Sequence, residues 1–143
     1  MIAYFDTSAV IPLLIGEPSS ATCARMWNEA ARSVSVRLLY PEARAALARA
    51  ERMGRITKRQ HEVAVAELET IITEIDHVEI TAQLARNAGD LAQAHQLRGY
   101  DAVHLAAAMA ALDAELVLVT GDNDLAGAAR AQGLPVALTT PTS

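Results

Sequence analysis

The sequence contains very little cysteine and very few aromatic residues. A single cysteine, Cys23, stands among 143 residues, so the chain cannot form an internal disulfide. Aromatic residues make up only 3% of the chain, and its 52% hydrophobic content comes mainly from alanine, leucine, valine and isoleucine. This composition favours helices packed against a buried sheet over a β-sandwich.

Long apolar runs are also missing. No run approaches the roughly 18 residues that a membrane span needs, and Asp6 interrupts the first one. No basic segment precedes that run, as an export signal would require. We therefore expect a cytoplasmic protein that does not enter a membrane. A chain of 143 residues has the usual length of one domain, and we expect a single domain that spans residues 1–143.

The net charge of -5 argues against a protein that holds nucleic acid through its overall field. The charge is nevertheless sorted along the chain. Nine of the 12 basic residues lie between Arg25 and Arg59, together with three acids, whereas residues 62–79 carry six acids and no lysine or arginine. Two explanations stay open, namely two solvated helix faces that attract one another and a basic surface that faces a polyanion.

Short apolar runs alternate with longer segments of helical spacing. Strands are expected at 2–5, 33–36, 76–80, 115–119 and 135–138, and helices at 7–14, 18–32, 38–53, 57–74, 81–96, 100–112 and 123–132. This alternation predicts an α/β domain with a mostly parallel central sheet of four to five strands, flanked by helices on both faces. A ligand site should lie beyond the carboxyl ends of the strands.

Four acidic residues stand where such a site would form. Asp6 and Asp122 each follow a predicted strand, and Asp124 competes with Asp122 for the second position. Glu42 and Asp101 lie on the apolar stripes of their helices, where a charge is expensive to desolvate. Each acid has an ordinary alternative as a helix cap, a first-turn acid that favours the helix dipole, or a member of a buried ion pair.

Several carboxylates at one sheet edge would repel one another and keep protons at neutral pH unless a cation joined them. Mg²⁺ takes oxygen ligands, and Mn²⁺ can replace it. Zinc fits less well, because the single cysteine and the four histidines form neither an HExxH motif nor a tight cluster. His104, three residues after Asp101, either supports that acid or is a satisfied core histidine.

Four segments carry a resemblance that covers nearly the whole chain. They are "YFDTSAV", "PEARAAL", "LRGYDAVHLAAA" and "LVTGDNDLAGAA". In this order and spacing the sequence resembles the PIN-domain ribonucleases, and within them the VapC-type toxins of toxin–antitoxin pairs. The resemblance implies a single PIN-like domain. It also implies that Asp6, Glu42, Asp101 and Asp122 are the catalytic acids that hold Mg²⁺ or Mn²⁺.

The resemblance further implies an activity and its partners. The expected activity is that of a metal-dependent endoribonuclease toxin, which hydrolyses RNA phosphodiester bonds with an activated water. The expected partners are a cognate VapB-like antitoxin and a second copy of the chain, in a homodimer that forms a heterotetramer or larger assembly with the antitoxin. The alternative is a non-catalytic PIN-like interaction module whose acids are structural caps and ion pairs.

Polar and basic residues near the four acids are candidates for positioning the substrate. These are Thr7, Ser8, Thr120, Arg44 and Arg49. The two arginines lie in the basic stretch that includes Glu42, and we expect them to hold the phosphate backbone rather than to read its sequence.

Overall fold

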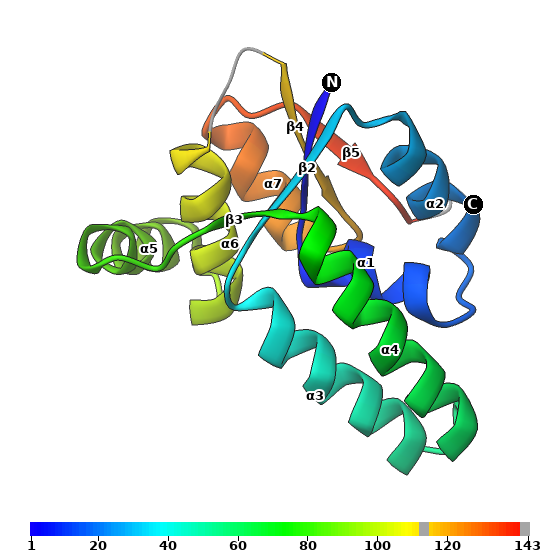
Figure 1. The fold of residues 1–143 in the computed structure, drawn as a ribbon. Coiled ribbons are helices and arrows are strands. Elements are labelled where there is room, and N and C mark those ends of the chain that lie inside the picture. The colour runs from blue at the N-terminus through cyan, green and yellow to red at the C-terminus, as the bar shows by residue number, and fades with distance from the viewer. Residues whose placement is uncertain (112–114, 141–143) are drawn as a thin grey trace.

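The chain folds around a five-stranded sheet, which Figure 1 shows in a computed structural model that describes residues 1–111 and 115–140. The strands are β1 (Ile2–Phe5), β2 (Arg32–Val36), β3 (Asp76–Val78), β4 (Leu116–Thr120) and β5 (Val136–Leu138). They follow the order β3-β2-β1-β4-β5, and every neighbouring pair is parallel. The predicted parallel sheet is confirmed at the upper end of its expected size.

Helices cover both faces of this sheet, as the sequence predicts (Figure 1). The helices are α1 (Thr7–Leu14), α2 (Ser20–Glu29), α3 (Leu39–Arg52), α4 (Lys58–Glu74), α5 (Ala82–His95), α6 (Gly99–Ala110) and α7 (Asn123–Ala131). Helices α1 to α4 pack on one face and α5 to α7 on the other. None of the helices in the described ranges is both long and apolar enough to cross a membrane.

The central strand β1 shows why two separate layers of core form. Successive side chains of a strand point to opposite faces. Tyr4 therefore enters the core beneath α5 to α7, whereas Ala3 and Phe5 enter the core beneath α1 to α4. All three are fully buried. A parallel strand that is buried on both faces reads as a continuous apolar run, and "IAYF" is such a run.

Some helix ends lie where local sequence signals predict them, whereas tertiary contacts shift other ends away from the expected positions. Thr57 accepts from the backbone N–H of Gln60 in a capping box at the start of α4, which begins within one residue of the expected position. The expected helix at 18–32 is too long, because α2 ends at Glu29 and Arg32 joins β2 in register with Ile2. The expected strand at 76–80 is also too long, since β3 ends at Val78.

The strand order brings distant segments together at one edge of the sheet. Phe5 of β1 lies in register with Val119 of β4, so the residues that follow these two strands are neighbours. The first turns of α3 and α6 lie near the same edge, at the lower end of the sheet in Figure 1. This edge holds the acids that the sequence singles out.

Candidate active site

Asp6 leaves β1 at this edge and is 3% exposed. It occupies the residue before α1, but its side chain makes no capping hydrogen bond there. The Ser8 hydroxyl donates to Oδ1 at 2.7 Å, and the Thr120 hydroxyl donates to Oδ2 at 3.0 Å. The helix-cap alternative for Asp6 is therefore wrong in this conformation, and two hydroxyl groups fix the carboxylate instead.

The surroundings of Asp6 disfavour its charge. The pKa of Asp6 is raised to about 6. Burial is the main cause and the nearby carboxylate of Asp122 adds to it, whereas His104 and the two hydroxyl groups act to lower the pKa. A buried carboxylate that titrates near neutrality gains strongly from a cation beside it. Perturbed acids of this kind are common at functional sites.

Asp122 follows β4 and uses its two carboxylate oxygens differently. Oδ1 accepts from the backbone N–H groups of Asp124 at 2.8 Å and Leu125 at 3.0 Å, which caps α7. Oδ2 lies 3.5 Å from Nη2 of Arg98. Asp122 can therefore cap α7 and take part in the site at the same time, because each role uses one carboxylate oxygen.

The turn between β4 and α7 packs directly on α1. The backbone N–H of Gly121 donates to the Ser8 hydroxyl at 2.9 Å, and the backbone N–H of Asp122 donates to the Thr120 hydroxyl at 3.0 Å. A Cβ atom on Gly121 would lie 3.0 Å from the Thr139 hydroxyl and 3.6 Å from that of Ser8. A side chain at this position would therefore require the Thr139 hydroxyl to move, whereas glycine does not.

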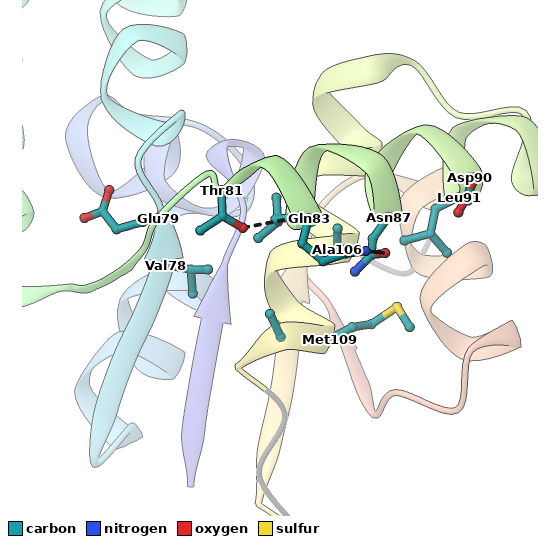
Figure 2. Close-up of a pocket in the computed structure, with 11 residues that line it drawn as sticks. Val78, Glu79, Thr81, Gln83, Asn87, Asp90, Leu91, Ala106 and Met109 are labelled. Carbon is teal, nitrogen blue, oxygen red and sulfur yellow. Dashed lines mark hydrogen bonds between the residues drawn. The ribbon is translucent and has the colours of Figure 1, made fainter.

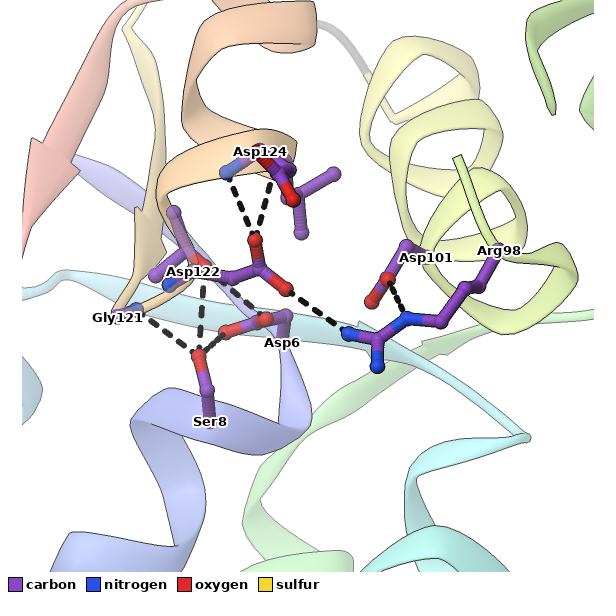
Figure 3. Close-up of polar contacts among 9 residues, drawn as sticks. Asp6, Ser8, Arg98, Asp101, Gly121, Asp122 and Asp124 are labelled. Carbon is purple, nitrogen blue, oxygen red and sulfur yellow. Dashed lines mark hydrogen bonds and ion pairs between the residues drawn. The ribbon is translucent and has the colours of Figure 1, made fainter. Parts of the chain in front are cut away.

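Asp101 enters the site from the first turn of α6 and is 7% exposed. Its Oδ2 accepts from Nε of Arg98 at 3.1 Å. Burial raises the pKa of Asp101, and Asp122 raises it further. Figure 3 shows the guanidinium of Arg98 between the carboxylates of Asp101 and Asp122, with Asp6 beside them. Arg98 was not predicted as a site residue, because no local pattern in the sequence marks it.

Glu42 lies in the first turn of α3 and is partly buried, with 20% of its side chain exposed. Its Oε1 accepts from the Thr7 hydroxyl at 2.9 Å and lies 2.7 Å from Nε2 of His104. Thr7 is next to Asp6, and His104 is one turn after Asp101 on α6. Glu42 is therefore tied to the elements that carry two of the other acids.

His104 is almost fully buried, at 1% exposed. A carboxylate can only accept, so Nε2 carries the hydrogen that Glu42 receives, and the Tyr4 hydroxyl lies 2.9 Å from Nδ1. Burial, followed by the charge of Asp6, raises the pKa of Tyr4 well above its usual value, which keeps this hydroxyl protonated. The acid that His104 contacts is thus Glu42 rather than Asp101.

The remaining predicted residues lie farther from this cluster. Arg44 donates from Nη1 to the Tyr40 hydroxyl at 2.9 Å, and Nε of Arg49 lies 3.4 Å from the sulfur of Met53. Both arginines are exposed on α3. Arg44 lies two positions after Glu42, and Arg49 lies seven positions after Glu42, almost two helical turns. The structure brings Thr7, Ser8 and Thr120 into direct contact with the acids, but not these two arginines.

The acidic and basic segments of the chain partly neutralise each other through ion pairs. Arg32 pairs with Asp76 at 2.7 Å, and Arg37 pairs with Glu79 at 2.8 Å. These pairs join β2 and the residue after it to β3 and the residue after it, and neither pair joins two helix faces. Both pairs are exposed, so each adds little to stability.

The donors in the cluster fit a hard divalent cation. They are carboxylate and hydroxyl oxygens, and the nearby imidazole is already engaged by Tyr4 and Glu42. In the conformation observed, residues 1–111 and 115–140 contain no group of three or more His, Cys, Asp and Glu side chains placed to hold a metal ion. The cation between Asp101 and Asp122 is instead the guanidinium of Arg98.

Comparisons with known proteins agree with this fold. The PIN domain model matches residues 3–131. Ribonuclease VapC45 and ribonuclease VapC49, from two strains of Mycobacterium tuberculosis, are each 42% identical over 136 residues, which covers 95% of this chain and 94% of the relative.

Solved structures also share the fold. PAE2754 from Pyrobaculum aerophilum has a TM-score of 0.70 at 22% identity, over 95% of this chain and 92% of its own. The sarcin-ricin loop cleaving toxin VapC20 of Mycobacterium tuberculosis has a TM-score of 0.70 at 20% identity, over 88% and 94%. A toxin–antitoxin complex from Klebsiella pneumoniae has a TM-score of 0.66 at 20% identity, over 98% and 99%.

Proposed function

Because the chain belongs to the PIN-domain family and, within it, to the VapC ribonucleases, we propose that it is an endoribonuclease toxin that cleaves RNA with Mg²⁺ or Mn²⁺. The observation that carries the metal-dependent part is the gathering of Asp6, Asp101 and Asp122 at one sheet edge (Figure 3). These acids come from three different elements, and burial raises the pKa of Asp6 and of Asp101. Such an arrangement is stable when a cation shares the charge.

In this proposal Asp6, Asp101 and Asp122 hold the ion, and Glu42 completes the acidic set. Asp122 is preferred over Asp124, because Asp124 is exposed on α7 while Oδ2 of Asp122 faces Arg98. A divalent ion at this place would lower the pKa of a bound water and neutralise charge on the phosphate. The hydroxyl groups of Ser8 and Thr120 keep the Asp6 carboxylate in one orientation.

Glu42 is placed to handle a proton. Both of its hydrogen-bond partners in the described part of the chain contact Oε1, so Oε2 is available to a water or an ion. A carboxylate that is oriented by two donors can accept the proton of an attacking water when the substrate is bound. Arg44, two positions farther along α3, is exposed and would hold the phosphate backbone with Arg49.

A VapB-like antitoxin is the proposed protein partner. The structural neighbours include a toxin–antitoxin complex from Klebsiella pneumoniae and VapBC2 from Rickettsia felis bound to a DNA fragment from its promoter. The family also suggests a homodimer, which would become a heterotetramer or larger with the antitoxin. Co-expression with the gene product encoded beside this chain, followed by measurement of the complex mass, tests both points.

Cleavage of structured RNA by the purified, antitoxin-free protein tests the activity. We expect cleavage with Mn²⁺ or Mg²⁺, 5′-phosphate ends, and loss of activity in EDTA. Asp122→Asn should lose most activity, and the matched control Asp124→Asn should keep it. Activity that survives both EDTA and Asp6→Asn would overturn the proposal, as would 2′,3′-cyclic phosphate products.

The ion pairs of Arg98 favour one alternative, a non-catalytic interaction module whose acids are already neutralised. This alternative expects no saturable Mn²⁺ binding and no change of melting temperature with metal. A true site should raise the melting temperature, because an ion that binds only the folded state stabilises it. Calorimetric titration of the wild type and Asp101→Asn separates the two.

A further inference from the structure

Arg98 is an exposed residue whose charged group is held by two acids from different elements. It directly precedes α6, and 66% of its side chain is exposed. Nε contacts Oδ2 of Asp101 at 3.1 Å, and Nη2 contacts Oδ2 of Asp122 at 3.5 Å. The guanidinium carbon lies 4.9 Å from the centre of the Tyr100 ring. Figure 3 shows the guanidinium bridging the two acids.

The oxygen atoms that Arg98 contacts are those that an ion would need. Oδ1 of Asp122 is occupied by the backbone N–H groups at the start of α7, so Oδ2 is the oxygen that can turn to a ligand. Asp101 likewise offers Oδ2 to Arg98. A divalent ion on these oxygens would bring two positive groups into the same space, and the more mobile group would have to leave.

The exchange is feasible because the arginine is held weakly. An ion pair with an exposed partner contributes little net free energy, since water solvates the guanidinium when the pair opens. The ring of Tyr100, 42% exposed, already contacts the guanidinium and can keep that contact after the guanidinium leaves the two acids. The planar fork of an arginine also matches the oxygens of a phosphate.

We propose that Arg98 is a substrate-binding residue that changes partners when the metal binds. Without metal it neutralises Asp101 and Asp122. With metal on these acids, its guanidinium turns outward beside Tyr100 and binds a phosphate of the RNA backbone. This inference rests on the proposed function. A purely structural role would not predict that one substitution of Arg98 strengthens Mn²⁺ binding and weakens RNA binding, as this inference does.

Three variants test it. Arg98→Gln removes the charge, Arg98→Lys keeps the charge without the fork, and Arg25→Gln is the matched control. Arg25 is exposed on α2, and the end of that helix lies beside Met1 at the opposite edge of the sheet. Circular dichroism and melting temperature confirm folding. Mn²⁺ affinity is then measured by calorimetric titration. The KM for RNA is measured separately, at saturating Mn²⁺.

We expect Arg98→Gln to bind Mn²⁺ about fivefold more tightly, because the competing cation is gone. Its KM for RNA should rise about tenfold, because a charged hydrogen-bond donor to phosphate is lost. Arg98→Lys should recover part of the RNA affinity, and Arg25→Gln should match the wild type in both measurements.

Unchanged or weaker Mn²⁺ binding by Arg98→Gln would show that Arg98 does not compete with the metal. An unchanged KM at saturating Mn²⁺ would show that it does not bind the substrate. Either result overturns the inference while the proposed function stands, provided that the wild type binds Mn²⁺ and Asp101→Asn does not. Failure of the wild type to bind Mn²⁺ and to cleave RNA would overturn the proposed function, and the inference with it.

Discussion

Nε2 of His104 lies 2.7 Å from Oε1 of Glu42, although the two residues are 62 positions apart in the sequence. The other ring nitrogen contacts the buried hydroxyl of Tyr4 at 2.9 Å. A chain of hydrogen bonds therefore runs from the centre of the sheet to an acid at its edge. It fixes both the orientation of the imidazole and the carboxylate that the imidazole contacts.

Substitution of His104 should weaken the site through Glu42. We expect His104→Ala to lose roughly 10- to 100-fold in Mn²⁺ affinity or in kcat, the usual cost of removing a residue that orients a ligand or base. His104→Gln should recover much of this loss, since its amide nitrogen can take the place of Nε2. His104→Asn, which is shorter, should not. Equal losses in Gln and Asn variants that fold normally would argue against an orienting role.

Asp6→Asn should stabilise the metal-free protein at neutral pH. The pKa of Asp6 is about 6 in the folded state, against an ordinary value of 3.8, so the folded protein binds this proton more tightly than the unfolded chain does. Wild-type stability therefore falls as pH rises from about 4 to 6 and stays lower above that range, by up to about 3 kcal/mol.

Urea unfolding of both proteins in EDTA between pH 4.5 and 8 measures this effect. The advantage of Asp6→Asn should be small at pH 4.5 and reach its full size above pH 7. A wild type that gains stability relative to Asp6→Asn as pH rises would show that this carboxylate is not strained by burial. Asp124→Asn, at an exposed position, is the control and should follow the wild type.

The affinity for Mn²⁺ should rise with pH, whereas the stability of the metal-free protein falls. Mn²⁺ needs the ionised form of Asp6, whose pKa is about 6, so binding releases a proton below that pH. We expect the affinity for Mn²⁺ to fall about tenfold for each pH unit below 6 and to level off above 7. Calorimetric titrations at pH 5, 6, 7 and 8 test this, and a flat profile would contradict it.

Gly121→Ala should disturb the site by packing alone. The added Cβ would lie 3.0 Å from the Thr139 hydroxyl and 3.6 Å from the Ser8 hydroxyl that holds Asp6. We expect a loss of about 1 to 3 kcal/mol in stability, as is typical of overpacking, together with weaker Mn²⁺ binding. Thermal unfolding and Mn²⁺ titration measure the two effects.

Gly89→Ala is the matched control for this substitution. Gly89 lies inside α5, and a Cβ atom there would have no atom within 4 Å apart from its chain neighbours and the backbone of its own helix. Alanine should therefore stabilise the protein by about 0.5 to 1 kcal/mol through helix propensity. If both variants lost stability to the same extent, the close approach at Gly121 would not be the cause.

The apolar groove beneath α5, which Figure 2 shows, was not visible in the sequence. Leu84 and Leu91 of α5 and Met109 of α6 line it, with Glu79 and Asp90 at polar positions. The periodicity of each helix marks which side chains are apolar, but it does not say whether a neighbouring element covers them. The width of this groove depends on how α5 and α6 pack, and that is a tertiary property.

The sequence by itself determined the alternation of strands and helices, and with it the parallel sheet and its two covered faces. It also determined that Asp6 and Asp122 follow strands, because an apolar run with an acid shortly after it is a local signal. Helix starts such as Thr57 were equally local, since a capping hydrogen bond joins residues three positions apart.

Only the tertiary structure decided which of these residues meet. The order β3-β2-β1-β4-β5 places Asp6 beside Thr120, and the packing of α6 brings Arg98 to Asp122 and His104 to Glu42. Such contacts join residues far apart in the chain, so no local spacing encodes them. The sequence set the chemistry of the acids, and the fold set their partners, because burial and hydrogen bonding at this edge depend on elements that converge only in space.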